Sequence, residues 1–126
     1  MPVQAGGYPT NGCVSKKMGA AGKFCQSAFK AWSQFAAGSS NASARDEAIS
    51  AAADKLDLSW DKAEKGADKK HAECKETTAT STQITADVGA LIDAVQASLG
   101  AAPTDADKKC HSQILGAAGK LCSGLL

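Results

Sequence analysis

The sequence has few aromatic residues and few of the residues that favour β-strands. It contains one tyrosine, two tryptophans and three phenylalanines. It also lacks runs of β-branched residues that alternate with polar ones. Alanine, lysine, aspartate and glutamate, which are abundant, are compatible with helices, whereas strands depend on β-branched and aromatic side chains. The composition therefore predicts an all-α chain.

Excess charge of one sign and long apolar runs are also missing. The 126 residues carry a formal net charge of +1, which argues against a nucleic-acid-binding protein, because such a protein needs a basic face to displace counterions. No apolar run approaches the ~20 residues needed to cross a bilayer. We therefore expect no membrane span, and a single domain of a size that can bury a core.

The two ends of the sequence lack terminal signals. The first seven residues have no apolar core of the kind found in signal peptides. If the natural protein is secreted, we expect its leader to be absent from this sequence and Met1 to be an addition. The uncapped end at Leu126 suggests a chain that continues past a domain boundary.

Apolar residues spaced three and four apart predict four helices. The first runs over about 13–37, the second from its N-cap Ser43 to about residue 74, the third over about 84–99 and the fourth from its N-cap Thr104 to about residue 122. Gly100 and Pro103 end the third. We expect residues 1–12 to be an irregular arm and residues 13–126 to be one helical-bundle domain. Short connections favour an up-down-up-down four-helix bundle, with a three-helix bundle containing one long kinked hairpin as the alternative.

The first and last helical segments resemble each other. Residues 13–25 read CVSKKMGAAGKFC and align without gaps to residues 110–122, which read CHSQILGAAGKLC. Both cysteines, the serine, the Gly-Ala-Ala-Gly-Lys run and a large apolar residue before the last cysteine coincide. This match predicts an internal duplication in which the two copies pack against each other.

Five cysteines in a chain of this size favour an oxidising compartment, so we expect a secreted or periplasmic protein. Twelve residues rise about 18 Å along a helix, whereas a disulfide joins Cα atoms roughly 4.4–6.8 Å apart. The two cysteines of one copy therefore cannot pair with each other. Antiparallel copies predict the bonds Cys13–Cys122 and Cys25–Cys110, and leave Cys74 as the free thiol.

The copies also predict which faces are buried. The expected apolar face consists of Val14, Ala21, Phe24 and Ala28 in one copy and of His111, Ala118, Leu121 and Leu125 in the other. Four glycines lie on the opposite face. They form a smooth strip for docking a partner, or they are tolerated surface residues or allow two helices of this chain to cross closely; these are Gly19, Gly22, Gly116 and Gly119.

Metal chemistry has one candidate position. His71 and Cys74 are three residues apart and share a helix face, and a zinc site that adds Cys13 and Cys122 is conceivable. No recognisable ligand spacing supports it, so the favoured interpretation is a disulfide at that end, with Cys74 spare and His71 as a partly buried core residue. No catalytic constellation is present, and we expect neither an enzyme nor a bound cofactor.

The sequence thus predicts a non-enzymatic, disulfide-stapled helical bundle that acts as a secreted binding or structural module. The expected partner is another protein or a second copy of the chain. One alternative is a metal-binding or redox protein that uses Cys74 and His71. The other is a carrier of small apolar ligands, with Trp32, Phe35 and Trp60 lining the bundle interior.

Overall fold

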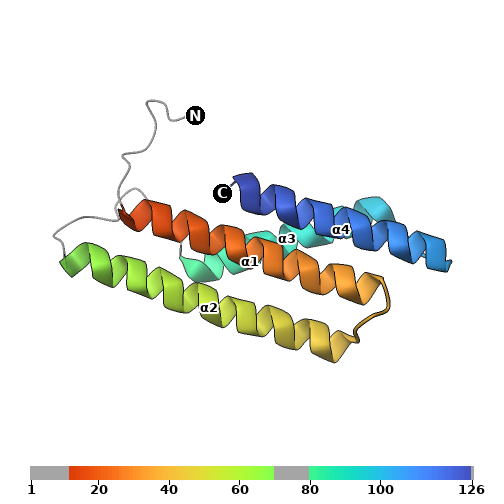
Figure 1. Cartoon of the computed structure of the whole chain (residues 1–126), viewed down its shortest axis with the longest axis horizontal. Coiled ribbons are helices and arrows are strands. Elements are labelled where there is room, and N and C mark those ends of the chain that lie inside the picture. Colours follow the sequence, from red (N-terminus) through yellow and green to blue (C-terminus); the bar gives the residue numbers. More distant parts are fainter. Residues whose placement is uncertain (1–11, 70–79, 126) are drawn as a thin grey trace.

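The structure is a computed structural model that describes residues 12–69 and 80–125, with side chains described over 15–66 and 80–124. Over these residues it contains four helices and no strand (Figure 1). They are α1 (Gly12–Ala36), α2 (Ala42–Lys69), α3 (Ser81–Leu99) and α4 (Asp105–Leu125). The predicted all-helical class is therefore confirmed. The N-terminal arm lies outside the described residues, apart from Gly12, which begins α1.

Polar side chains fix the starts of three helices. The Asn41 Oδ1 atom accepts a hydrogen bond of 2.8 Å from the Ala44 N–H, so Asn41 is the N-cap of α2 and the prediction of Ser43 was wrong. Thr80 caps α3 in a capping box: its hydroxyl accepts from the Gln83 N–H, and the Gln83 side chain accepts from the Thr80 N–H. The predicted cap of α4 is confirmed, since Thr104 Oγ1 accepts from the Asp107 N–H at 3.1 Å.

Two glycines end helices in a conformation that other residues avoid. Gly38 follows α1 with φ 80°, and Gly100 follows α3 with φ 74°. The Gly100 N–H donates to the Gln96 carbonyl at 3.1 Å. A side chain at either position would strain the backbone, so these glycines define the two sharp connections α1–α2 and α3–α4.

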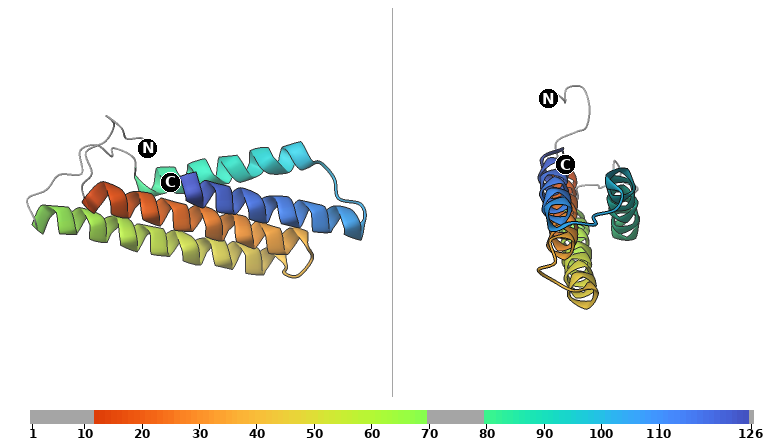
Figure 2. Two further views of the ribbon diagram at one scale, coloured as in Figure 1. Left: turned by 45° about the horizontal axis from the view of Figure 1, so that its top comes forward. Right: turned by 90° about the vertical axis from the view of Figure 1, so that its right-hand side faces the viewer.

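Three helices form one layer, and the fourth packs on one face of that layer. α1 lies in the middle, with α2 along one side and α4 along the other, and α3 packs over one face of this layer (Figure 2). Consecutive helices run in opposite directions (Figure 1). Because α1 has neighbours on both sides and α3 behind it, α1 supplies most of the buried side chains.

The core combines small residues with a few large ones. On α1, Phe24, Cys25 and Phe29 are at most 3% exposed, and alanines fill the space around them. The other helices add fewer side chains, namely Leu56, Trp60 and Ala63 from α2, Val88 and Ile92 from α3, and Leu115 from α4. A core with this much alanine buries little apolar area per residue, so each large side chain carries much of the stability.

The apolar face predicted for α4 is wrong at Leu121, although Ala118 does pack against the core. Leu121, expected in the core, is 65% exposed, while Leu115 is 1% exposed. His111 and Ala118 are half-buried, and the Leu125 side chain lies outside the described residues. The face of α4 that meets α1 instead runs through Ser112, Leu115, Gly119 and Cys122, at the three- and four-residue spacing of one helix face.

Candidate functional site

A disulfide joins the central helix to the last one, but not in the predicted pairing. Cys25 of α1 bonds to Cys122 of α4 with their Cα atoms 6.1 Å apart, and it links residues separated by 97 positions. The predicted bonds Cys13–Cys122 and Cys25–Cys110 are therefore wrong. Cys25 is completely buried, so the bond lies inside the α1–α4 contact.

Of the other three cysteines, the structure describes the side chain of Cys110 only. Cys110, predicted to be bonded, is a free thiol exposed on α4. Cys74 lies outside the described residues, as does the side chain of Cys13, so the prediction that Cys74 is free stays a prediction.

The pairing differs because α4 is displaced along α1 from the register in which the two copies would lie side by side. Since Cys25 meets Cys122 instead of Cys110, the displacement is the whole distance between the two cysteines of α4, about 18 Å. The described contacts of α4 with α1 include Cys25, Phe29 and Ser33. Phe29 and Ser33 lie beyond residues 13–25, so the similarity between the two segments does not define the contact.

Two serines hold the same register further along the contact. The Ser33 hydroxyl donates to the Ser112 carbonyl at 2.7 Å, and the two hydroxyl oxygens are 2.9 Å apart. Because the Ser33 proton is used on the carbonyl, the Ser112 hydroxyl donates to Ser33 Oγ. The partly buried pair is thereby satisfied without water.

Gly116 and Gly119 of α4 belong to this internal contact. A Cβ atom at Gly119 would lie 2.7 Å from the Phe29 Cβ, and one at Gly116 would lie 3.7 Å from Ser33 Oγ. In α1, by contrast, a Cβ at Gly19 would meet nothing within 4 Å. Close crossing of two helices therefore explains Gly119, while Gly19 lies on an open surface.

Most of the candidate metal ligands lie outside the described residues. His71, Cys74 and the side chain of Cys13 lie outside the described residues, and Cys122, the fourth proposed ligand, is bonded to Cys25. Within the described parts of the chain, no group of three or more His, Cys, Asp or Glu side chains could hold a metal ion.

The aromatic side chains proposed to line an interior pocket pack against cationic side chains. Trp32 and Phe35 meet edge to face with their centroids 5.7 Å apart, and the Arg45 guanidinium lies 4.2 Å and 4.5 Å from the two ring centres. Trp60 is buried under the Lys17 ammonium, which lies 4.8 Å from its ring centre. The cationic side chains are held over the faces of these rings by cation–π attraction.

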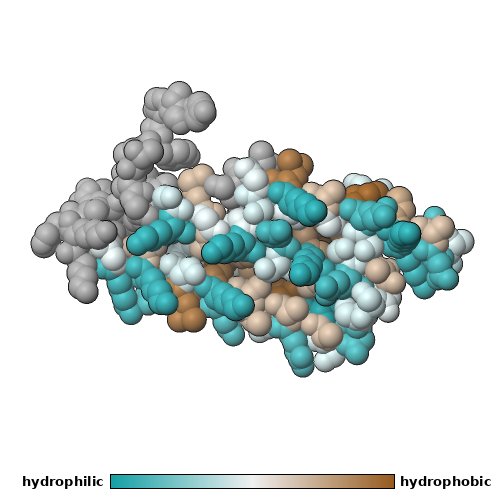
Figure 3. All heavy atoms as spheres, viewed as in Figure 1, coloured by the Kyte–Doolittle hydropathy of each residue, from teal (hydrophilic) through white to brown (hydrophobic). Residues whose placement is uncertain are grey.

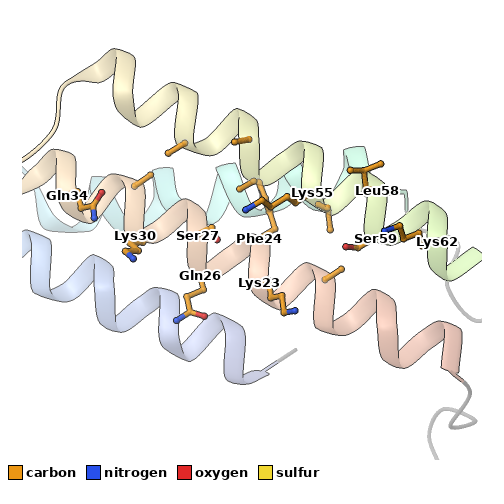
Figure 4. Close-up of a pocket in the computed structure, with 16 residues that line it drawn as sticks. Lys23, Phe24, Gln26, Ser27, Lys30, Gln34, Lys55, Leu58, Ser59 and Lys62 are labelled. Atoms are coloured by element: carbon orange, nitrogen blue, oxygen red, sulfur yellow. The ribbon is translucent and has the colours of Figure 1, made fainter.

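A groove runs between α1 and α2, on the face turned away from α3 (Figure 4). Its volume is about 720 Å³. Buried or small side chains form its floor, and they are Ala20, Phe24, Ala31, Ala51, Ala52 and Leu56. We call this feature the α1–α2 groove.

Four lysines border the α1–α2 groove. Lys23 and Lys30 extend from α1, and Lys55 and Lys62 extend from α2 (Figure 4). No carboxylate lines the groove. Among the described side chains, none of these four lysines pairs with an acidic group within 4.0 Å. The lining is therefore cationic at its borders and apolar at its floor.

Carboxylates of α2 are paired elsewhere. Glu64 lies 3.4 Å from the buried Lys17 ammonium, and Asp61 bonds to Lys65 at 2.8 Å. The hydrogen bond from Lys65 to Asp61, together with the attraction of that charge, raises the pKa of Lys65 above its ordinary value. The space-filling view shows polar side chains over this face of α1 and α2, with smaller and less polar residues between them (Figure 3).

The groove was not predicted from the sequence, because its lysines come from two separate helices. A signal was present. Lys16, Lys23 and Lys30 recur every seven residues on α1, and Lys55, Lys62 and Lys69 do so on α2. Such spacing places each set along one side of its helix, but only the packing of α1 against α2 brings the two sets to opposite borders of one groove.

Comparison with known proteins adds no assignment: no protein-family model matches the chain, and no curated protein or solved structure has significant similarity to it. Among the described helices, none is both long enough and apolar enough to cross a membrane.

Proposed function

We propose that this protein is a non-enzymatic, secreted binding module, and that the α1–α2 groove receives an acidic protein partner. The observation that carries the proposal is the lining of the groove: four lysines at its borders, no carboxylate, and a floor of alanines, Phe24 and Leu56. Cationic borders attract an acidic partner and orient it, while the apolar floor supplies area to bury.

The rest of the fold supports a role in binding. Leu58, at the border of the groove on α2, is 61% exposed, and an exposed leucine beside an apolar floor extends the surface that a partner can cover. The Cys25–Cys122 bond supports secretion, because disulfides persist in oxidising compartments.

An acidic polymer without fixed structure tests this proposal. We would titrate isotope-labelled protein with poly-L-glutamate at neutral pH and map the NMR shift changes, using poly-L-lysine as the charge control. We expect changes concentrated at the residues lining the α1–α2 groove, and their loss in the double variant K23E/K55E. Lysine and glutamate have similar helix propensities, so this variant should keep the fold.

A matched variant separates the groove from charge in general. K108E/K109E reverses two exposed lysines near the start of α4, outside the groove, where the positive helix end tolerates carboxylates. It should bind poly-L-glutamate like the unmodified protein. Shift changes scattered over all lysines, or an equal loss in both double variants, would reject the groove as the binding surface.

A further inference from the structure

We propose that the partner segment in the α1–α2 groove is an amphipathic helix with acidic residues along both sides of a narrow apolar face. This inference rests on the proposed function and names the form of the acidic partner. It follows from three features of the groove: the face on which it lies, the size of its floor residues and the spacing of its lysines.

The first feature is the pair of faces that α1 and α2 present. On one face, α3 lies against both helices and buries Val88 and Ile92 between them and itself (Figure 2). The α1–α2 groove lies on the other face, where no helix of the described chain packs (Figure 4). α1 and α2 thus already pack against one helix, α3, on one face. Their opposite face presents a similar surface on which a second helix can pack.

The second feature is the floor. Ala20 and Ala31 on α1 and Ala51 and Ala52 on α2 line the groove. Packed helices have axes about 8–10 Å apart, depending on the side chains between them, and alanines allow the near end of this range. The alanines therefore let the side chains of an incoming helix approach closely, and Phe24 and Leu56 add apolar surface for them to contact.

The third feature is the spacing of charge. Lys23 and Lys30 are seven residues apart on α1, and Lys55 and Lys62 are seven apart on α2. Seven residues are about two turns, or roughly 10.5 Å. A helix lying along the groove repeats its flanking positions at the same interval, so glutamates on both sides of its apolar face meet lysines on both borders. A single carboxylate on an apolar tail would leave most of these cations unmatched.

Two displayed peptide libraries test the inference. Both contain peptides three heptads long with the same composition. In the patterned library, varied apolar residues occupy the a and d positions and glutamate the e and g positions; in the scrambled library, the order is shuffled so that no face forms. Selection on the intact protein is followed by counter-selection on K23E/K55E.

We expect binders from the patterned library alone. Their affinity should fall at least about tenfold for K23E/K55E and stay unchanged for K108E/K109E, and the peptides should gain helical circular dichroism on binding. Groove-dependent binders from both libraries in equal number would overturn the helix and leave the acidic partner standing. If neither library yields groove-dependent binders, both proposals fail. Palmitate binding that depends on the groove lysines, without peptide binding, would assign the groove to an anionic lipid instead.

Discussion

Gly119 of α4 packs directly on Phe29 of α1, and a Cβ atom at Gly119 would lie 2.7 Å from the Phe29 Cβ. The same part of the contact holds the Cys25–Cys122 bond and the Ser33–Ser112 hydrogen bonds. A glycine, a disulfide and a hydroxyl pair therefore fix one register between α1 and α4. Each can be tested separately.

Replacing Gly119 by alanine should destabilise the protein. The Phe29 Cβ is tied to its backbone and cannot rotate away, so α1 and α4 must move apart; overpacking of this kind costs roughly 1–3 kcal/mol. Gly19→Ala is the matched control, because nothing lies within 4 Å of the new Cβ. We expect it to stabilise the protein by up to about 1 kcal/mol through helix propensity. Urea unfolding of both variants measures the difference.

The decisive result is whether each substitution raises or lowers the free energy of unfolding. If Gly119→Ala were as stabilising as Gly19→Ala, the close contact with Phe29 would be absent and the register of α4 would have to be reassigned.

Two leucines of α4 should respond very differently to truncation. Leu115 is 1% exposed and Leu121 is 65% exposed. Leu115→Ala should lower the free energy of unfolding by roughly 2–5 kcal/mol, whereas Leu121→Ala should change it by less than about 0.5 kcal/mol. Chemical denaturation checks both. The reverse order would restore the face that the sequence repeat predicts.

The four helices could be predicted because their signals are local. Apolar spacing, Thr104 before α4 and Gly100 after α3 act within a few residues of the helix that they define. The N-cap of α2 was misplaced because Asn41 and Ser43 both have capping side chains, and the choice between them depends on where the backbone leaves the turn at Gly38.

The disulfide could not be predicted, because pairing depends on how far one helix is displaced along another. The repeat implied that its two copies meet, yet the surface that receives α4 contains Phe29 and Ser33, which lie beyond the copy in α1. A large side chain opposite a glycine fixed the register, and similarity between two segments carries no information about such a match. The α1–α2 groove could not be predicted for the same reason, because its lysines come from two helices and border one groove only when those helices pack together.

The N-cap of α2 provides a test of a local prediction. Asn41→Ala removes the acceptor for the Ala44 N–H and should cost about 1 kcal/mol. Ser43→Ala is the control. Ser43 is exposed within the first turn of α2, where alanine is the better helix former, so this change should be neutral or slightly stabilising. Thermal unfolding followed by circular dichroism compares them. A larger loss for Ser43→Ala would reinstate Ser43 as the cap.

The Cys25–Cys122 bond should contribute a large share of the stability. It joins residues 97 positions apart, and on the chain-entropy model closure of such a loop is worth roughly 4–5 kcal/mol, in a domain whose net stability is typically about 5–15 kcal/mol. The double variant C25A/C122A should therefore melt at a much lower temperature. C110A should melt like the unmodified protein, because Cys110 is exposed and unbonded.

Alkylation before reduction, followed by peptide mapping, tests the pairing directly. We expect the Cys110 peptide to be labelled, and the Cys25 and Cys122 peptides to be recovered as one cross-linked species. Recovery of Cys25 linked to Cys110 would show that α4 lies in the register in which the two copies meet, and would remove the structural basis for the Gly119 and Leu115 predictions as well. Labelling of Cys25 and Cys122 before reduction would show that they are not bonded to each other and would contradict the pairing.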